Sequence, residues 1–147
     1  MGITVAPPSG WDATIYRRPP GPGEQTFPIV HAATVALPVQ RGDYGAGLVE
    51  RLGYSDVFVA LLEFGPDAAD TPLFAAVPEV PQLSPASYRP RQLQRTIAGQ
   101  AGVQRFFTVA GRAFCLYSVI GSIANSVKAS TQANQCITSL HISSSGI

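Results

Sequence analysis

The stretch QRFFTVAGRAFCLYSVIGS, residues 104–122, predicts the fold more strongly than any other part of the chain. Aromatic and β-branched residues, which favour strands, fill both halves of it, and the dipeptide Ala110-Gly111 separates the halves. A two-residue turn that contains glycine is typical of a β-hairpin. A hairpin with this turn places Val109 opposite Arg112. The stretch therefore predicts an antiparallel hairpin in the centre of the core.

The segments around this hairpin extend the same pattern. DVFVALLEF (56–64) is the most apolar run and predicts a central strand that is covered on both faces. Proline and glycine separate the other strand candidates, as they do between strands of a sheet. These candidates are ITV (3–5), WDATIYRR (11–18), PIVHAATVALP (28–38), RQLQRTIAG (91–99) and LHI (140–142).

Two segments have helical character. GDYGAGLVERLG (42–53) predicts a short helix that Gly53 ends. SIANSVKASTQANQCITSL (122–140) predicts a longer C-terminal helix, with Ser122 or its neighbour as the cap. The helical spacing places one set of side chains on its inner face: Ile123, Val127, Ser130, Asn134 and Ile137. The fold class is therefore α+β, an antiparallel sheet of about six strands flanked by this helix and one or two short helices.

The composition limits the classes of partner. The 147 residues fit one domain (1–147), in which a proline-rich loop spans 65–90. Only 13% of the residues are charged and the net charge is +1, so the composition gives no reason to expect binding of nucleic acid, which normally requires a basic face. No apolar run is long enough to insert in a membrane, and the N-terminus does not resemble a secretory signal. We expect a cytoplasmic protein with reduced thiols.

The two cysteines are expected to be structural. The hairpin places Cys115 in mid-strand, opposite Phe106, where burial raises a thiol pKa rather than lowering it. Cys136 is expected to line the inner face of the C-terminal helix, and a disulfide between the two is geometrically conceivable but not expected. Two cysteines are too few for a zinc site, and no catalytic or cofactor motif occurs in the sequence. We expect no metal and no cofactor.

The charged residues of the strands need partners. Glu63 ends the apolar strand, and an ion pair with a strand arginine is the expected solution, because buried charges are usually paired. Arg95, Arg105 and Arg112 lie in three successive strand candidates, 91–99 and the two halves of the hairpin, and a turn within AGQAG would bring Arg95 and Arg105 almost opposite each other. Like charges in that position require an acid or an anion between them. These residues are therefore candidates for an anion or partner site.

The order of the elements resembles the PsbP/Mog-type α+β superfamily. The resemblance rests on PSGW (8–11), GRAFCLYSVIG (111–121) and NQCITSLHI (134–142). It implies an antiparallel sheet flanked by helices, with a last helix that leads into a short final strand. It also implies a docking or accessory role rather than catalysis. The segment GPDAADTPLFAAVPEVPQLSPASYRP (65–90) has no counterpart in the pattern.

The leading functional hypothesis is a non-enzymatic protein-interaction or assembly domain that binds another protein or copies of itself. Its contact residues are expected to be aromatic side chains beside flexible proline segments: Tyr16, Tyr44, Phe74 and Tyr88. The alternative is a small-molecule or anion-binding protein, or an enzyme. It would use a pocket between the sheet and the C-terminal helix that contains Arg95, Arg105, Glu63 and His31. A thiol-dependent protein would need His31 or His141 beside a cysteine.

Overall fold

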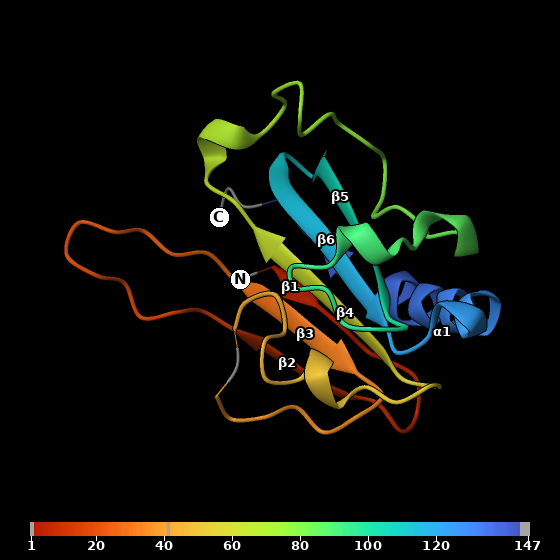
Figure 1. Cartoon of the computed structure of the whole chain (residues 1–147). Helices are drawn as coiled ribbons and strands as arrows, with labels where there is room; N and C mark the ends of the chain where they lie inside the picture. The colour runs from red at the N-terminus through yellow and green to blue at the C-terminus, as the bar shows by residue number, and fades with distance from the viewer. Residues whose placement is uncertain (1, 41, 145–147) are drawn as a thin grey trace.

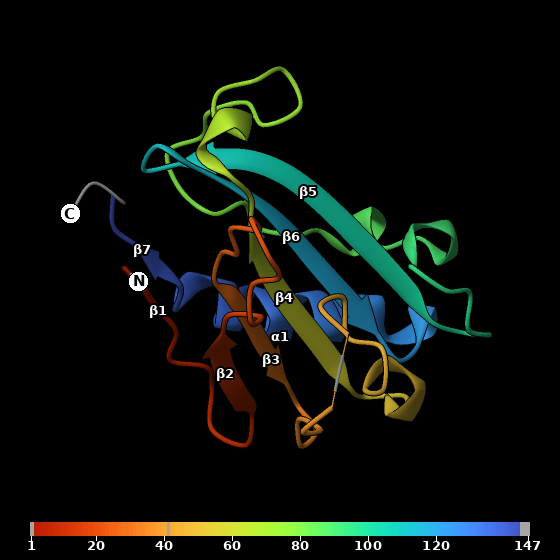
Figure 2. The same cartoon turned by 90° about the vertical axis from the view of Figure 1, so that its left-hand side faces the viewer.

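A five-stranded antiparallel sheet forms the centre of the molecule (Figures 1 and 2). The computed structural model describes residues 2–40 and 42–144. The strands follow the spatial order β2-β3-β4-β6-β5. Their bounds are β2 Asp12–Tyr16, β3 Ile29–Ala33, β4 Val57–Glu63, β5 Ala101–Val109 and β6 Arg112–Ile120. The strands pair as neighbours in antiparallel register throughout, which confirms an α+β fold built on an antiparallel sheet.

The two remaining strands and the α-helix lie near the ends of the chain. β1 (Ile3–Thr4) and β7 (His141–Ile142) form a two-stranded antiparallel sheet, which brings the N-terminal and C-terminal segments together. α1 (Ser126–Thr138) lies across one face of the large sheet, behind β3 and β4 in Figure 2. No helix of residues 2–40 and 42–144 has the length and apolar character needed to cross a bilayer.

The predicted hairpin is present with the predicted register. β5 and β6 pair with Val109 opposite Arg112 and Phe106 opposite Cys115. The turn residues Ala110 and Gly111 have φ angles of 53° and 76°, and positive φ at both positions is what a two-residue type I′ turn requires. β4 lies beside β6 in the middle of the sheet, and Val57 to Leu62 are all buried, as a strand covered on both faces must be.

Each face of the sheet carries its own core. On the α1 face, alternate strand residues such as Leu61, Phe114 and Leu116 pack with helix residues that include Ala133 and Ile137. On the opposite face, Phe58, Leu62, Cys115 and Tyr117 pack with side chains from the connection between β3 and β4. Among the described residues of that connection, 34–40 and 42–56, only Val49–Arg51 (η1) is helical, as a single 3-10 turn, so the short helix expected over 42–53 is reduced to three residues.

The long proline-rich segment between β4 and β5 packs along the outer edge of β5. It contains three 3-10 turns, η2 (Pro66–Ala68), η3 (Pro85–Ser87) and η4 (Pro90–Gln92), each with proline at its start. The strand expected over 91–99 is wrong, because that stretch holds η4 and irregular turns. Leu93 and Ile97 are its only large apolar residues, so an edge strand there could bury very little.

The predicted inner face of the C-terminal helix is only partly correct. Ser130 and Ile137 are buried as predicted, but Ile123 and Val127 are exposed. The helical spacing changes at its start: Ile123–Asn125 form a 3-10 turn (η5), and Ser122 caps that turn through a 3.3 Å bond from the Ala124 N–H. The buried face belongs instead to small residues that allow close approach to the sheet: Ala129, Ala133 and Cys136.

Candidate functional site

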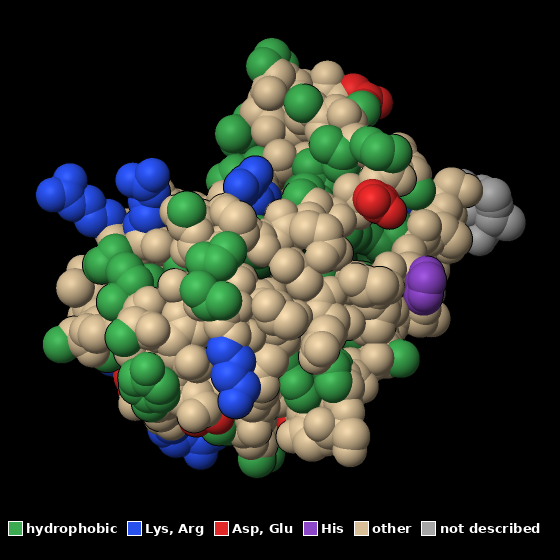
Figure 3. All heavy atoms as spheres, turned by 90° about the vertical axis from the view of Figure 1, so that its right-hand side faces the viewer, with side chains coloured by type: hydrophobic (Ala, Val, Ile, Leu, Met, Phe, Trp, Pro, Cys, Tyr) green, Lys and Arg blue, Asp and Glu red, His purple; other side chains and the backbone are tan. Residues whose placement is uncertain are grey.

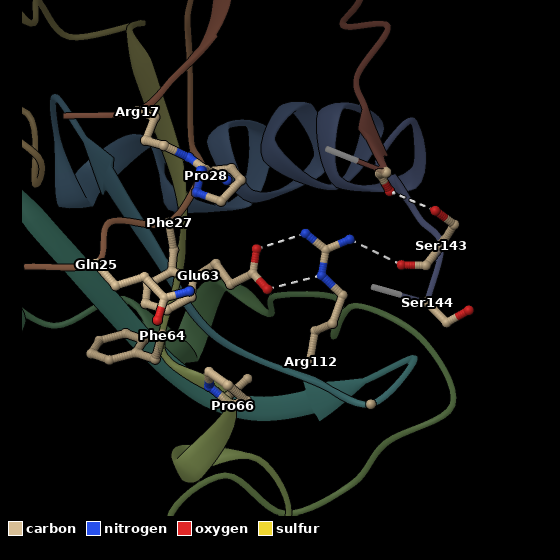
Figure 4. A pocket seen from close by; sticks show the side chains of 13 residues that line it. Arg17, Gln25, Phe27, Pro28, Glu63, Phe64, Pro66, Arg112, Ser143 and Ser144 are labelled. Carbon is tan, nitrogen blue, oxygen red and sulfur yellow. Dashed lines mark hydrogen bonds and ion pairs between the residues drawn. The ribbon is translucent and has the colours of Figure 1, made fainter. Parts of the chain in front are cut away.

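A cavity of about 380 Å³ lies where β4 ends and β6 begins (Figure 4). Its wall combines these two strands, the connection that follows β2 and the C-terminal segment. Aromatic and proline side chains cover one side, and a pair of oppositely charged side chains lies in the middle of the view. The lining includes Arg17, Phe27, Glu63, Phe64, Arg112 and Ser143.

The charged pair is Glu63 of β4 with Arg112 of β6. Arg112 Nε and Nη2 donate to the two Glu63 carboxylate oxygens at 2.9 and 2.6 Å, a bidentate arrangement, while Nη1 donates to the Ser143 carbonyl at 3.0 Å (Figure 4). The side chains are only 8% and 4% exposed. The expected ion pair between Glu63 and a strand arginine is confirmed. Bidentate geometry and an additional acceptor are what make burial of both charges tolerable.

The Arg112 guanidinium is therefore already neutralised, and it connects the C-terminal segment to the sheet. Arg17 is exposed and lines the same cavity, so the described lining carries one positive charge beyond the ion pair. An anion in the cavity would meet Glu63 as well as Arg112. The arrangement favours a structural role for Glu63 and Arg112 over anion binding.

The three arginines predicted as an anion site do not converge. Arg95 precedes β5, and its guanidinium lies 3.5 Å from the Glu50 carboxylate. Arg105 lies in β5 opposite Leu116, and donates to Ser87 Oγ at 3.2 Å. The predicted juxtaposition of Arg95 and Arg105 is therefore wrong, because the hairpin that would have produced it does not form. Each guanidinium has its own local acceptor.

Small buried side chains of α1, among them Ala129, Ala133 and Cys136, pack against the sheet along most of the helix. A cavity of about 430 Å³ lies at the end of α1, where Ile137, Thr138 and Val109 line it, but none of the four residues expected in a pocket between sheet and helix does so. Glu63, Arg95 and Arg105 line three different surface cavities. His31 is fully buried in β3, where its Nε2 donates to the Asp43 carbonyl at 2.7 Å. The four residues of the alternative hypothesis thus lie in separate places.

Two of the predicted contact aromatics are buried, contrary to the expectation of exposure. Phe74 packs edge-on against Phe106, and Tyr88 shares a 2.8 Å hydrogen bond with Ser118 inside the core. Burial raises the pKa of Tyr88 well above its ordinary value. The reason is that the proline-rich segment packs on β5 and β6 and turns its aromatic side chains inward.

The other two contact candidates are half-buried. Tyr16 of β2 donates to Asp43 Oδ1 at 3.0 Å, and its ring meets His31 edge-on with centroids 5.2 Å apart. Tyr44 meets Tyr117 edge-on at 5.4 Å, and burial raises the pKa of the Tyr44 hydroxyl. Both therefore help to cover the sheet face opposite α1, and their outer edges remain at the surface.

The cysteines lie on opposite faces of the sheet. Cys115 belongs to the core opposite α1, whereas Cys136 belongs to the core beneath α1, and both are free and fully buried. The sheet separates them, which removes the geometric case for a disulfide. Burial raises the pKa of each thiol to about 12, the reverse of what a nucleophilic thiol needs.

An exposed apolar group escaped the sequence-based predictions. Tyr54, Ile123 and Val127 are 62%, 43% and 71% exposed. We call these three residues the sheet-end patch. The four-residue spacing of Ile123 and Val127 did indicate that these two side chains share a face of a helix, but sequence reasoning assigned them to its inner face. Tyr54 follows Gly53 in a tight turn, and no pattern in the sequence indicated that it is exposed.

Residues 2–40 and 42–144 contain no cluster of acidic, histidine and cysteine side chains that could hold a metal ion. No protein-family model, curated protein or solved structure matches this chain.

Proposed function

We propose that this chain is a non-enzymatic protein-interaction domain, and that the sheet-end patch is a surface through which it binds another protein. The observation that carries the proposal is the exposure of Tyr54, Ile123 and Val127 on adjoining segments. Large apolar side chains that cluster at a surface are typical of interaction sites, and tyrosine is enriched among residues that dominate binding energy.

Backbone contacts hold the patch together. The Gly121 N–H donates to the Asp56 carbonyl at 2.9 Å, and Asn125 Nδ2 donates to the Tyr54 carbonyl at 3.4 Å. The backbone of Gly53 packs so closely on Gly121 that no side chain fits there. The turn before β4 and the connection between β6 and α1 are therefore one rigid unit. A rigid surface loses little conformational entropy when it binds.

The low charge of the surface supports the same proposal. In Figure 3, which faces the side where α1 lies in Figure 1, hydrophobic side chains are scattered among polar and backbone atoms, and the charged side chains are separated by wide uncharged areas. Charged residues are depleted at the centres of interfaces, since their desolvation is costly. A partner could bind on this side of the molecule at a small free-energy cost for desolvating charged side chains.

The finer fold assignment belongs to the proposal as well. We propose that the chain has a PsbP/Mog-type arrangement, supported by the C-terminal helix that leads into a short final strand beside the antiparallel sheet. That resemblance is consistent with an accessory role, but fold similarity alone carries little weight for function. The patch is therefore the feature to test.

The test compares two charge substitutions at apolar positions that are both more than half exposed. Val127→Lys lies in the sheet-end patch, and Leu73→Lys, at a site that is 62% exposed, lies in the segment after β4. Each purified protein is used as bait in the cells that produce it, and captured proteins are identified by mass spectrometry. We expect the wild type and Leu73→Lys to retain the same protein and Val127→Lys to lose it. Equal capture by both variants, or capture of nothing by the wild type, would overturn the proposal.

A further inference from the structure

The backbone of β2 is open on its outer side. β2 is the last strand in the sheet order, so only β3 pairs with it (Figures 1 and 2). In antiparallel ladders, alternate residues direct their N–H and C=O groups to opposite sides of the strand. The β2 residues whose N–H and C=O groups point away from the sheet can be identified once it is known whether the odd-numbered or the even-numbered residues of β3 bond to β2. We call this odd or even alternation the parity of the strand.

Two backbone bonds give that parity. Thr34 N–H donates to Val57 O at 3.1 Å, and Glu63 N–H donates to Pro28 O at 3.2 Å, so the even-numbered residues around β3 bond to β4. The odd-numbered residues of β3 bond to β2. Their partners in the register are Asp12, Thr14 and Tyr16. Ala13 and Ile15 therefore direct their N–H and C=O groups away from the sheet.

These outward groups have no hydrogen-bond partner within the described parts of the chain. The backbone bonds outside the helices and strands include none to Ala13 or Ile15. Within β2, whose sequence is DATIY, Asp12 at the first position is the one charged residue, and the strand contains neither lysine nor proline to block pairing along its outer edge. An unprotected strand of β-forming residues is a site for pairing with another strand.

We infer that two copies of this chain pair through their β2 strands, antiparallel about a two-fold axis at Thr14. In this register Ala13 of each copy is the hydrogen-bonded partner of Ile15 of the other copy, which gives two such pairs. In each pair, both N–H groups donate to the C=O group of the opposite residue, so every outward backbone group of Ala13 and Ile15 has a partner. Thr14 faces its own copy as a non-hydrogen-bonded pair. The two sheets join into one continuous sheet of ten strands.

The side chains support this register. Trp11, Ala13 and Ile15 all pack toward the α1 face, and Arg17 has the same parity. Pairing about Thr14 places Trp11 of one copy opposite Arg17 of the other, where a guanidinium can contact an indole face. No like charges stand opposite each other along the paired strands, a combination that would disfavour pairing. The surface is therefore complementary to itself.

This inference goes beyond the proposed function, since it names a second copy of the chain as a partner and uses a surface other than the sheet-end patch. The sheet-end patch lies at the start of β4 and α1, away from β2, so both contacts can form at once. A variant that breaks β2 pairing should still capture the partner of the patch. Loss of one without the other distinguishes failure of the inference from failure of the proposed function.

The first experiment measures solution mass for the wild type and Ala13→Pro. Proline at position 13 removes an outward N–H and leaves the ladder with β3 intact, as proline does on edge strands. Light scattering over a concentration series should give twice 15.5 kDa for the wild type and 15.5 kDa for the variant. A wild type that is monomeric at millimolar concentration, or a folded variant that is still dimeric, would contradict the inference.

The second experiment is a cross-linking comparison that does not depend on how Ala13→Pro folds. Thr14→Cys introduces a thiol at the axis, where non-hydrogen-bonded partners bring Cβ atoms about 4.5–5.5 Å apart. Arg105→Cys is the matched control, since Arg105, like Thr14, lies in an edge strand and directs its N–H and C=O groups toward the neighbouring strand of the sheet. Mild oxidation should link most of the Thr14→Cys protein into covalent dimer and little of the control. Equal yields for the two variants would overturn the inference.

Discussion

The two edges of the sheet differ in how their backbone groups are satisfied. The outer edge of β5 is covered at both ends: Arg89 and Gly102 exchange two backbone bonds of 2.9 and 3.0 Å, and Thr108 is bonded to the chain at Ala75 and Val77. The outer edge of β2 has no such cover among the described residues. The comparison shows that the proline-rich segment protects the β5 edge, whereas the described residues leave the β2 edge uncovered.

This contrast changes the role expected of residues 65–90. From the sequence they were expected to form a long proline-rich loop whose aromatic side chains are available for contacts. Instead the segment buries Phe74, Val80, Leu83 and Tyr88 against the sheet. Prolines cannot donate to a ladder, which makes the segment suitable for ending a sheet rather than extending it. The strand without that cover is therefore the better candidate for assembly.

The largest expected loss of stability comes from breaking the ion pair between Glu63 and Arg112, whose strands lie between the two edge strands of the sheet. Arg112→Leu removes the guanidinium and leaves the Glu63 carboxylate buried without its partner, which should lower the free energy of unfolding by about 3–5 kcal/mol. Because β4 and β6 lie between the edges, both edges should lose protection together. Urea unfolding measures the change.

The matched control replaces both charges. In Glu63→Leu with Arg112→Leu, no charge remains unpaired, so much of the lost stability should return. If Arg112→Leu alone were as stable as the wild type, the ion pair would not hold the centre of the sheet.

A pair of Thr→Val substitutions compares the edges directly. Thr108 is buried in β5, where its hydroxyl accepts from Asp70 N–H at 2.9 Å and donates to Phe74 O at 2.6 Å. Thr108→Val keeps the side-chain shape but leaves both backbone groups unsatisfied, at a cost of about 3 kcal/mol. Thr14→Val in β2 removes no side-chain hydrogen bond seen in the described residues and should cost less than about 0.5 kcal/mol. Thermal unfolding of both variants provides the comparison, and equal losses would mean that the edges are held alike.

The thiols give a smaller effect that depends on pH. The ordinary thiol pKa of 9.0 applies to the unfolded chain, and burial raises the pKa of Cys115 and Cys136 to about 12 in the folded protein. The folded state therefore binds these protons more tightly. Stability from this source is complete below pH 9 and falls as the pH rises from 9 toward 12, by about 1.4 kcal/mol per pH unit for each thiol.

Unfolding at pH 8 and pH 10.5 tests the thiol prediction. Cys136→Ala lowers stability at both pH values but should have the shallower pH dependence, because one buried proton is lost. A slope equal to that of the wild type would contradict the burial of this thiol. Thiol titration should find two reactive groups in denaturant and almost none in the native protein.

The parts of the fold that local chemistry determines could be predicted from the sequence. The Ala110-Gly111 turn and its flanking strands gave the correct register of β5 and β6, and the apolar run 57–62 gave the central strand. That Glu63 pairs with a strand arginine followed from the cost of an unpaired buried charge, although the sequence did not single out Arg112. In each case a local pattern or a single electrostatic requirement was sufficient.

Features that depend on long-range packing could not be predicted. No local pattern shows that residues 65–90 return to cover β5, so Phe74 and Tyr88 were expected at the surface. The 3-10 turn Ile123–Asn125 shifts the helical phase, and this shift exposes Val127. Which strands lie at the edges follows only from the assembled sheet. The open edge and the sheet-end patch therefore had no signal in the sequence strong enough to identify them.

Amide hydrogen exchange, followed residue by residue at several protein concentrations, tests the account of the two edges most directly. Gly102 and Thr108 donate to the covering segment at 3.0 Å each, so their amides should be protected at every concentration. The amides of Ala13 and Ile15 should exchange rapidly in dilute protein and slow down as the concentration rises and β2 pairs with its copy. Protection of Ala13 and Ile15 that is the same at all concentrations, or absent at all of them, would contradict the account.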